Sequence, residues 1–582
     1  MTSASPAKSL QQFHEAGTAR LQGTDVSALD ATRVDAARAF LHANSASYEH
    51  LVRRVTRQDP RREPGKVLGA IAAAANFAGS FHPGRFSDGA LENLLLEIGR
   101  SEQAVAATTP EAARTRAVDT PLHVLHVATR VLSIGGHSRM LHRWIGEDRG
   151  NRHSMALTCQ DRDHVPAWLA EAVESAGGEI LALGDTTTEC ERAAVLRRHA
   201  HACADLVVLH HFGDDVIPSL AFAVDGGPPV AVVNHADHMF WLGNSVADLC
   251  VDLRSITNEH SVSRRHIQRT TVLPIPLPAP IDGVDREAAR RELGVGPDDV
   301  VLLTVARATK FRPCGGQDFL ATVETVLARD PAIHLYVIGE TEKGMTQLLE
   351  RPLHPRIHCL GTVEYPTRHR AAADVYIETF PFGSNTALLE AALDGLPVVP
   401  ACRPLTKLLV AANDSLQDFV TNPVDEAEYV ERILAFVGNP QGRQAFGRRL
   451  RDELSKHHVG SAWLSHLQRV YQAAEGLLHR PRPTPTTRCE ALPADIGLAL
   501  FNATSNGRST SGGNLHSRVA ALRHSAFVAK HARDFARARR LSFAAVLADV
   551  RGSDTWRLFL VCMLGPIARA TGDRLRRMGR TS

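Results

Sequence analysis

The chain has 582 residues, enough for three or four domains of ordinary size. It is 44% hydrophobic and 22% charged, as expected of a globular protein, and its formal net charge is only +3. These values argue against a strongly basic nucleic-acid binder and against a long acidic disordered chain. No uncharged apolar run reaches the ~18 residues of a membrane-spanning helix. The nine cysteines lack CxxC spacing and the first residues carry no secretory signal, so we expect a cytoplasmic protein without disulfides or a zinc site.

Residues 1–118 show helical periodicity and predict a helical accessory domain. From residue 119 onward, short apolar segments alternate with helix-length segments, which is typical of parallel strands covered by helices on both faces. The strands predicted within 119–282 are 123–130, 154–159, 179–184, 205–211, 229–235 and 248–253. The Pro-rich stretch 271–283 is interpreted as a linker between domains.

The alternation then restarts within 283–478. Two successive series of this kind predict an α/β fold with two Rossmann-like domains facing a cleft. A second Pro-rich linker, 480–488, opens a C-terminal extension, 479–582, which is predicted to be helical and basic. The strands predicted in the second series are 299–307, 333–339, 357–363, 374–379, 396–401 and 418–421.

The segment 374–400, DVYIETFPFGSNTALLEAALDGLPVVP, carries the strongest functional signal. A strand ends near residue 379, and a turn leads into a helix that starts near Asn385. Gly383, Ser384, Asn385 and Thr386 therefore lie where free backbone N–H groups and the helix dipole favour a phosphate. The alternative is that these polar residues are only N-caps of the helix.

The same segment resembles the donor-binding motif of GT-B glycosyltransferases of the family 4 type. In that family a Glu-x7-Glu element precedes a Gly-x-Pro-Val-Val strand. Glu390 matches the second glutamate, which the resemblance assigns to the nucleotide ribose, although an exposed helix glutamate is the alternative. The first glutamate is replaced by Phe382, so contact with the donor sugar and the choice between retention and inversion stay open. The string TFPFGSNT is also similar to the phosphate turn of O-GlcNAc-transferase-like enzymes, which invert.

Basic residues follow the first predicted strand of the second series, in LLTVARATKFRPCGG (302–316). The resemblance places an arginine and a lysine here on the donor diphosphate. Arg307 matches the arginine, and Lys310 is preferred over Arg312 for the second role. Cations at this place would stabilise the charge that develops on the departing diphosphate. A solvated basic loop is the alternative interpretation.

Two motifs in the first series complete the candidate site. Gly135 and Gly136 fall in the first strand-to-helix loop, where paired glycines let a backbone approach a ligand closely. His235 and Asp237 follow a predicted strand at the cleft side of the sheet. If the enzyme inverts, either is a candidate general base on the acceptor hydroxyl, and if it retains, His235 would position the sugar. A strand-end histidine with a purely structural role is the alternative.

Together these motifs predict a glycosyltransferase that moves a sugar from a nucleoside-diphosphate sugar to the hydroxyl of a glycan, lipid-linked or protein acceptor in surface polysaccharide or glycoconjugate synthesis. The base of the nucleotide is expected near Thr362 and Val363. No cofactor, metal or nucleic acid is expected, because Arg and Lys take the place of a cation. The alternatives are a nucleotide-sugar 2-epimerase of the same fold and a non-catalytic scaffold protein.

The near-neutral net charge is an average over unlike parts of the chain. Residues 517–582 contain fourteen Lys or Arg and four Asp, a net charge of +10, so the remaining residues carry −7. Arginines in 517–582 are interleaved with apolar residues, which suits peripheral contact with an anionic membrane at the inner face. A helical cap with a solvated basic face is the alternative.

Overall fold

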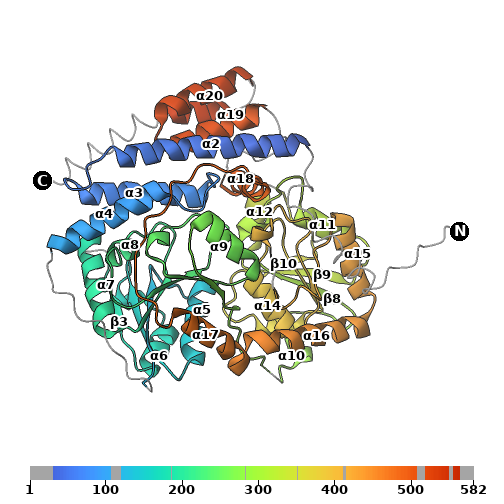
Figure 1. Ribbon diagram of the computed structural model, residues 1–582. Helices are drawn as coiled ribbons and strands as arrows, with labels where there is room; N and C mark the ends of the chain where they lie inside the picture. The colour runs from blue at the N-terminus through green and yellow to red at the C-terminus, as the bar shows by residue number, and fades with distance from the viewer. Residues whose placement is uncertain are drawn as a thin grey trace, which may run out of the picture.

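Two parallel β-sheets form the body of the protein, each flanked by helices, in a computed structural model (Figure 1). The described residues are 31–105, 120–184, 187–281, 283–349, 351–410, 414–506, 518–548 and 555–563. The first sheet has the order β3-β2-β1-β4-β5-β6-β7 and the second has the order β10-β9-β8-β11-β12. The strands are β1 His123–Ala128, β2 Arg152–Leu157, β3 Ile180–Ala182, β4 Leu206–His210, β5 Val230–Asn234, β6 Leu249–Asp252, β7 Thr270–Val272, β8 Val300–Val305, β9 Ile333–Ile338, β10 Ile357–Cys359, β11 Val375–Ile377 and β12 Val398–Val399.

The predicted α/β fold of GT-B type is therefore confirmed, with two differences in detail. β7 was not predicted, because Thr270–Val272 is a three-residue edge strand that overlaps the start of the Pro-rich stretch 271–283. Residues 418–421 were predicted as a strand but form a turn, which is closed by hydrogen bonds from the amides of Phe419 and Val420 to the carbonyl of Leu416. An apolar tetrapeptide does not distinguish a short strand from a packed turn.

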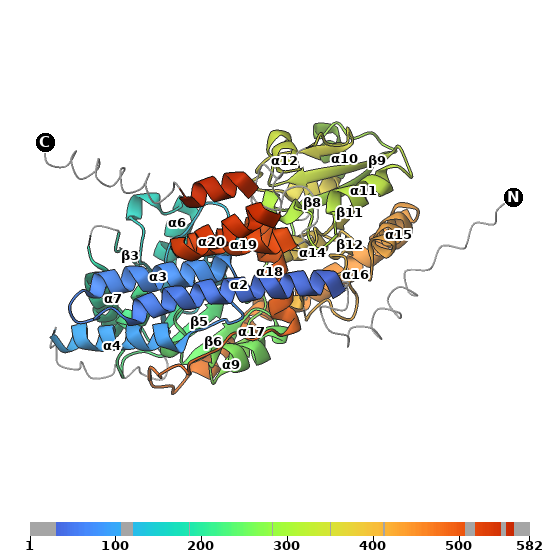
Figure 2. The same cartoon turned by 90° about the horizontal axis from the view of Figure 1, so that it is seen from above.

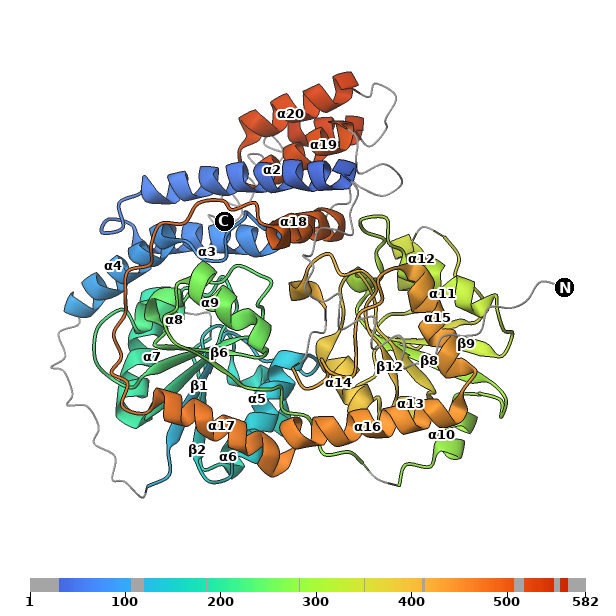
Figure 3. The ribbon, with the colours of Figure 1, turned by 45° about the vertical axis from the view of Figure 1, so that its right-hand side comes forward.

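Helices cover both faces of each sheet, as buried parallel strands require. Figure 3 shows α16 and α17 running in succession beneath both halves. Trp463 and Leu467 of α17 pack with Val124 of β1 and Trp144 of α5 in the first half, although the sequence placed this stretch in the second domain. The helices around the sheets are α5 Gly136–Glu147, α6 Ala167–Ser175, α7 Glu189–Cys203, α8 Ile217–Ala221, α9 Asn258–Arg265, α10 Arg286–Glu292, α11 Phe319–Leu327, α12 Glu342–Leu349, α13 Thr367–Ala372, α14 Asn385–Leu393, α15 Glu426–Val437, α16 Pro440–His458 and α17 Gly460–Ala474.

A helical layer lies over the two halves, as Figure 2 shows from above. It comprises α2 Ala31–Thr56, α3 Pro64–Ser80, α4 Gly89–Val105 and α18 Pro493–Asn506. Phe40 of α2 and Leu500 of α18 share an apolar cluster with Cys314 and Leu409 of the second half. The layer is fixed to the first half by a buried polar network in which Asp495 accepts from His82 and Arg264.

The stretch 480–488, predicted as a stiff linker, packs along the first half. Asn93 exchanges two hydrogen bonds with the backbone of Thr484, and a Cβ at Gly89 would lie 2.3 Å from the Thr484 carbonyl oxygen. Beyond it, α19 Arg518–His531 and α20 Phe535–Ala548 pack as a pair on α2. Across the described ranges, no helix is both long and apolar enough to cross a membrane.

Candidate functional site

A cavity of about 230 Å³ lies between the two halves and is lined by six of the fourteen predicted site residues. Its walls come from the carboxyl end of β5, the start of α5, the turn before α14 and the loop around residue 409. Larger cavities behind β12 and beside α17 contain none of the predicted site residues. The cavity is lined by Gly136, His137, Met140, Asn234, His235, Asp237, His238, Leu253, Arg254, Ile275, Phe382, Gly383, Asn385, Thr386, Leu408, Leu409 and Val410.

The amino ends of α5 and α14 face each other across this cavity. A Cβ at Gly136, the first residue of α5, would lie 3.5 Å from Oγ1 of Thr386 in the first turn of α14. Gly135 has a φ of 148°, a backbone conformation that favours glycine. Two opposed helix amino ends place free N–H groups and positive dipole ends around one space, an arrangement that suits a diphosphate.

Lys310 is directed at the turn before α14. Its Nζ donates to the Gly383 carbonyl at 2.5 Å and to Ser384 Oγ at 3.0 Å, and it lies 4.3 Å from the centre of the Phe382 ring. Burial lowers the pKa of Lys310 to about 8. Of Lys310 and Arg312, the two residues considered as the second cation on the donor diphosphate, Lys310 thus reaches the turn at residues 383–386.

The other two basic residues of the loop lie differently. Arg307 is exposed and precedes the short helix η4 Ala308–Phe311, close enough for its charge to lower the pKa of Lys310. Arg312 follows that helix, is half-buried and is not among the residues that line the cavity. The structure therefore brings Lys310 to the turn before α14, whereas neither Arg307 nor Arg312 is among the residues that line the cavity.

Glu390 lies one turn into α14 and is held by two arginines. Its Oε1 accepts from Arg143 of α5 at 2.7 Å, and its Oε2 accepts from Arg370 at 3.2 Å. The side chain is buried, so the alternative of an exposed helix glutamate does not apply. The pair with Arg143 joins the two halves, and each carboxylate oxygen of Glu390 already accepts a hydrogen bond from an arginine.

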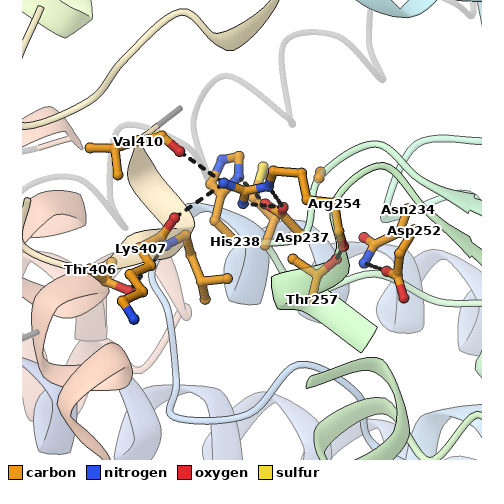
Figure 4. A network of polar contacts seen from close by, with 12 residues as sticks. Asn234, Asp237, His238, Asp252, Arg254, Thr257, Thr406, Lys407 and Val410 are labelled. Carbon is orange, nitrogen blue, oxygen red and sulfur yellow. Dashed lines mark hydrogen bonds and ion pairs between the residues drawn. The ribbon is translucent and has the colours of Figure 1, made fainter. Parts of the chain in front are cut away.

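His235 and Asp237 line the same cavity in different electrostatic settings. The carboxylate of Asp237 is paired with Arg254, which also donates to the carbonyls of Lys407 and Val410 in the second half (Figure 4). Arg254 and His238 hold the pKa of Asp237 below its ordinary range despite its burial. Burial lowers the pKa of His235 well below its ordinary value as well, so the difference between the two groups is that Asp237 would have to leave Arg254 before it could take up a proton.

Thr362 and Val363 lie outside the cavity, on the loop after β10. Thr362 is exposed and Val363 is half-buried. The neighbouring Glu364 accepts at its backbone carbonyl from Arg139 of α5, so this loop borders the junction of the two halves. The structure therefore does not join these two residues to the phosphate turn.

Comparison with known proteins identifies the second half. Residues 299–439 match the family described as glycosyl transferases group 1. This part of the chain is therefore similar to a glycosyl transferases group 1 domain. The match confirms the predicted resemblance to GT-B glycosyltransferases.

The comparisons beyond this domain are more distant. The D-inositol 3-phosphate glycosyltransferase of Geodermatophilus obscurus is 31% identical over 245 residues, which cover 38% of this chain and about half (49%) of that protein. Among solved structures, HepE of Anabaena with UDP and glucose is 16% identical at a TM-score of 0.47, over 61% of this chain and 100% of that one. An O-GlcNAc transferase variant of Thermobaculum terrenum is 17% identical at a TM-score of 0.47, over 74% of this chain and 84% of that one.

The group 1 domain also contains a functional candidate that the sequence analysis missed. Glu378 follows β11, is fully buried, and accepts from the backbone N–H of Ser384. Burial raises its pKa to about 7, while the ammonium of Lys310 opposes that shift. A Cβ at Gly383 would lie 2.9 Å from the Glu378 carboxyl carbon, so the turn needs glycine there. An acidic residue at the end of an apolar strand, directly before the turn, was the available signal.

Proposed function

We propose that the protein is a metal-independent glycosyltransferase that uses a nucleoside-diphosphate sugar. The observation that carries the proposal is that the amino ends of α5 and α14 face one cavity, with His235 on its wall and the Lys310 ammonium bonded to the turn before α14. The cation and the helix dipoles would stabilise the departing diphosphate. His235 would accept the proton of an acceptor hydroxyl, and Arg307 would add charge at the rim. The group 1 family match supports this activity.

The experiment that tests the proposal is a thermal-shift screen of UDP-, GDP- and dTDP-sugars, followed by transfer assays with the sugars that bind. A ligand that binds only the folded state raises its apparent stability, by about 2.7 kcal/mol at a concentration 100 times Kd. No shift with any nucleotide sugar would contradict the proposal and favour a scaffold protein. Turnover should persist in EDTA, because Lys310 and Arg307 supply the positive charge.

Donor binding should require the two halves to separate. The cavity is smaller than the roughly 300–1,000 Å³ of ordinary ligand pockets. The Arg143–Glu390 pair and the bonds from Arg254 to the Lys407 and Val410 carbonyls hold it narrow. We therefore propose that Glu390 exchanges Arg143 for the ribose hydroxyls when the donor enters.

This exchange predicts opposite effects for two variants. Glu390→Ala should weaken nucleotide binding by about 1–3 kcal/mol, the cost of a lost charged hydrogen bond. Arg143→Ala should leave the affinity unchanged or increase it, because the ribose no longer has to displace a cation. Isothermal titration with UDP, or with the nucleotide found in the screen, measures both. Equal weakening in the two variants would show that Glu390 acts only in joining the halves.

We also propose that the C-terminal helices contact an anionic membrane at the cytoplasmic face, near a lipid-linked acceptor. Apolar side chains between 40% and 65% exposed gather in the described part of 517–582, and basic residues surround them. Such a combination binds the headgroup region by apolar burial and by charge. The exposed apolar residues are Phe543, Leu547, Trp556, Leu560, Val561 and Met563. The remaining predicted tail residues lie outside the described residues.

Replacing part of this apolar surface should release the protein from vesicles. Leu547→Glu with Leu560→Glu should reduce co-sedimentation with phosphatidylglycerol-containing vesicles several-fold. Ile281→Glu is the matched control, because Ile281 is 65% exposed on a different surface. Equal pelleting of all three proteins would rule out the tail as the contact.

A further inference from the structure

Four histidines form a continuous hydrogen-bonded line across the first sheet and end at the cavity. His153 Nδ1 lies 3.0 Å from His126 Nε2, and His126 Nδ1 lies 3.1 Å from His210 Nε2. His210 Nδ1 lies 2.8 Å from His235 Nε2. His153, His126 and His210 are fully buried, whereas His235 is half-buried on the cavity wall. The line therefore connects the interior of the sheet with the candidate base.

The strand register produces this line. His153, His126 and His210 lie on β2, β1 and β4, which are neighbours in the sheet, and His235 follows the next strand, β5. On β1, Val124 lies opposite His153, and His126 is two residues further along. On β4, Val208 lies opposite His126, and His210 is again two residues further along. Steps of two residues keep all four side chains on one face and advance by roughly 6.6 Å toward the carboxyl edge.

A carboxylate closes the inner end. His153 Nε2 lies 3.1 Å from both the backbone oxygen and Oδ2 of Asp148. Asn151 and the Tyr471 hydroxyl also donate to the Asp148 carboxylate, and together with His153 they keep its pKa below the ordinary value despite burial. Trp144 packs edge-on against His126 and His210 and donates to the Tyr471 hydroxyl. The inner end thus offers only acceptors to His153.

The Asp148 carboxylate at the inner end determines which nitrogen of each histidine ring carries the proton. Burial lowers the pKa of His126, His210 and His235 well below the ordinary value, so these rings are neutral and each has one donor and one acceptor nitrogen. Because Asp148 can only accept, His153 donates from Nε2, and in its neutral form it accepts at Nδ1. Repeating this assignment outward leaves His235 with its proton on Nε2 and a lone pair on Nδ1.

We propose that His153, His126 and His210 are positioning residues that hold His235 in this tautomer and carry inward the charge of the proton that His235 accepts. The proposal rests on the proposed transferase function. In the step, the acceptor O–H bond breaks as its oxygen attacks the sugar, and the proton binds His235 Nδ1. The Nε2 protons of His235, His210 and His126 then pass to Nδ1 of His210, His126 and His153. Three rings end neutral, and His153 ends as an imidazolium beside Asp148.

This transfer of protons along the four histidines, called the relay below, avoids an unfavourable positive charge on His235. A positive charge on that ring alone is unfavourable because the ring is desolvated and lies beside His137 and His210, with ring centres 4.5 and 5.1 Å away. At His153 the same charge faces the carboxylate of Asp148. The reverse passage, with the proton leaving for the diphosphate or water, restores the starting state.

The first test reads the tautomer directly and needs no substrate. ¹⁵N-histidine NMR of the full chain, with the His235 signal assigned from His235→Asn, should show Nε2 protonated and Nδ1 unprotonated. His126→Phe breaks the line and should give a mixture of both tautomers at His235. His123→Phe is the matched control, because His123 is buried on the same strand but bonds Ser154 Oγ outside the line. A protonated Nδ1 in the native protein, or an unchanged tautomer in His126→Phe, would overturn the proposal.

The second test is kinetic and separates this inference from the proposed function. With the donor found in the thermal-shift screen, His126→Phe should lower kcat roughly 10²-fold or more with donor KM unchanged, while His123→Phe keeps both. Equal kcat in His126→Phe and the native protein overturns the relay and leaves the transferase proposal intact. Absence of transfer by the native protein overturns the transferase proposal, and the tautomer measurement then decides the relay.

One competing arrangement is also decided by measurement. A nitrogen from each of His137, His210 and His235 lies within 4.8 Å of the others, so the three could surround a metal ion. The structure favours the relay because both nitrogens of His210 already have histidine partners. Stoichiometric zinc in the purified full chain, lost in His137→Asn, would overturn the relay. Metal-free protein with the Nε2 tautomer supports it.

Discussion

Arg307→Ala combined with Lys310→Ala should abolish donor turnover, with a loss of at least 10²–10³-fold in kcat/KM for both sugar transfer and donor hydrolysis. Removing one preorganised group that stabilises developing charge costs about 2.7–4 kcal/mol, and here two cations are removed. Lys310 should account for most of the effect, because its ammonium contacts Gly383 and Ser384 of the phosphate turn, whereas Arg307 is exposed. Transfer and hydrolysis assays at donor concentrations below KM measure the loss.

Lys343→Ala is the matched control, since Lys343 is an exposed lysine in the same half. The melting temperature should be measured alongside, because Lys310→Ala leaves Glu378 buried without its cation. Lys310→Met nearly keeps the volume of the side chain but removes its charge, and it should lose as much activity as Lys310→Ala. Near-native turnover in a folded double variant would remove both residues from the proposed mechanism.

The same lysine predicts how activity depends on pH. Burial lowers the pKa of Lys310 to about 8, so the ammonium is present below that pH and is lost as the pH rises through it. We therefore expect kcat/KM to fall above about pH 8, well before an ordinary lysine would titrate. A profile that stays flat to pH 10 would contradict a catalytic charge on Lys310.

Local patterns suggested the candidate phosphate site because each of its parts is a short motif that follows a strand. The turn 383–386 and Lys310 each follow a strand of the same sheet, and the carboxyl ends of parallel strands meet at one edge. Glu378 was missed because it closes an apolar strand, where the pattern indicates only burial. The place of α17 was missed for a similar reason. Its apolar face could cover either sheet, and α17 covers the first sheet only because α16 runs across from the second half to the first.

Long-range pairings could not be predicted from one sequence. Arg143 and Glu390 are 247 positions apart, and no local pattern relates them. The histidine line depends on strand register, which helices of variable length leave open in a parallel sheet. Three of the four histidines lay in predicted strands, and His153 immediately preceded the strand predicted at 154–159. Their offset of two residues from strand to strand appears only when β2, β1, β4 and β5 are aligned.

His235→Asn should lower kcat for transfer by roughly 10²–10⁴-fold, the usual contribution of a general base, with little change in donor affinity. The expectation follows from the place of His235 on the cavity wall, with its Nε2 bonded to His210 and its Nδ1 directed away from that bond. Single-turnover assays with donor and acceptor measure the chemical step without product release.

Asp237→Asn separates His235 from the other candidate base. Asp237 is held by Arg254, which ties it to the carbonyls of Lys407 and Val410, so its loss should loosen the contact between the halves and raise KM more than it lowers kcat. His457→Asn, a substitution of a part-exposed histidine on α16, controls for histidine replacement as such. The opposite result, a kcat abolished by Asp237→Asn and nearly kept by His235→Asn, would assign the base to Asp237. The Arg254 pair would then have to open before the reaction, because a carboxylate held by an arginine does not take up a proton near neutral pH.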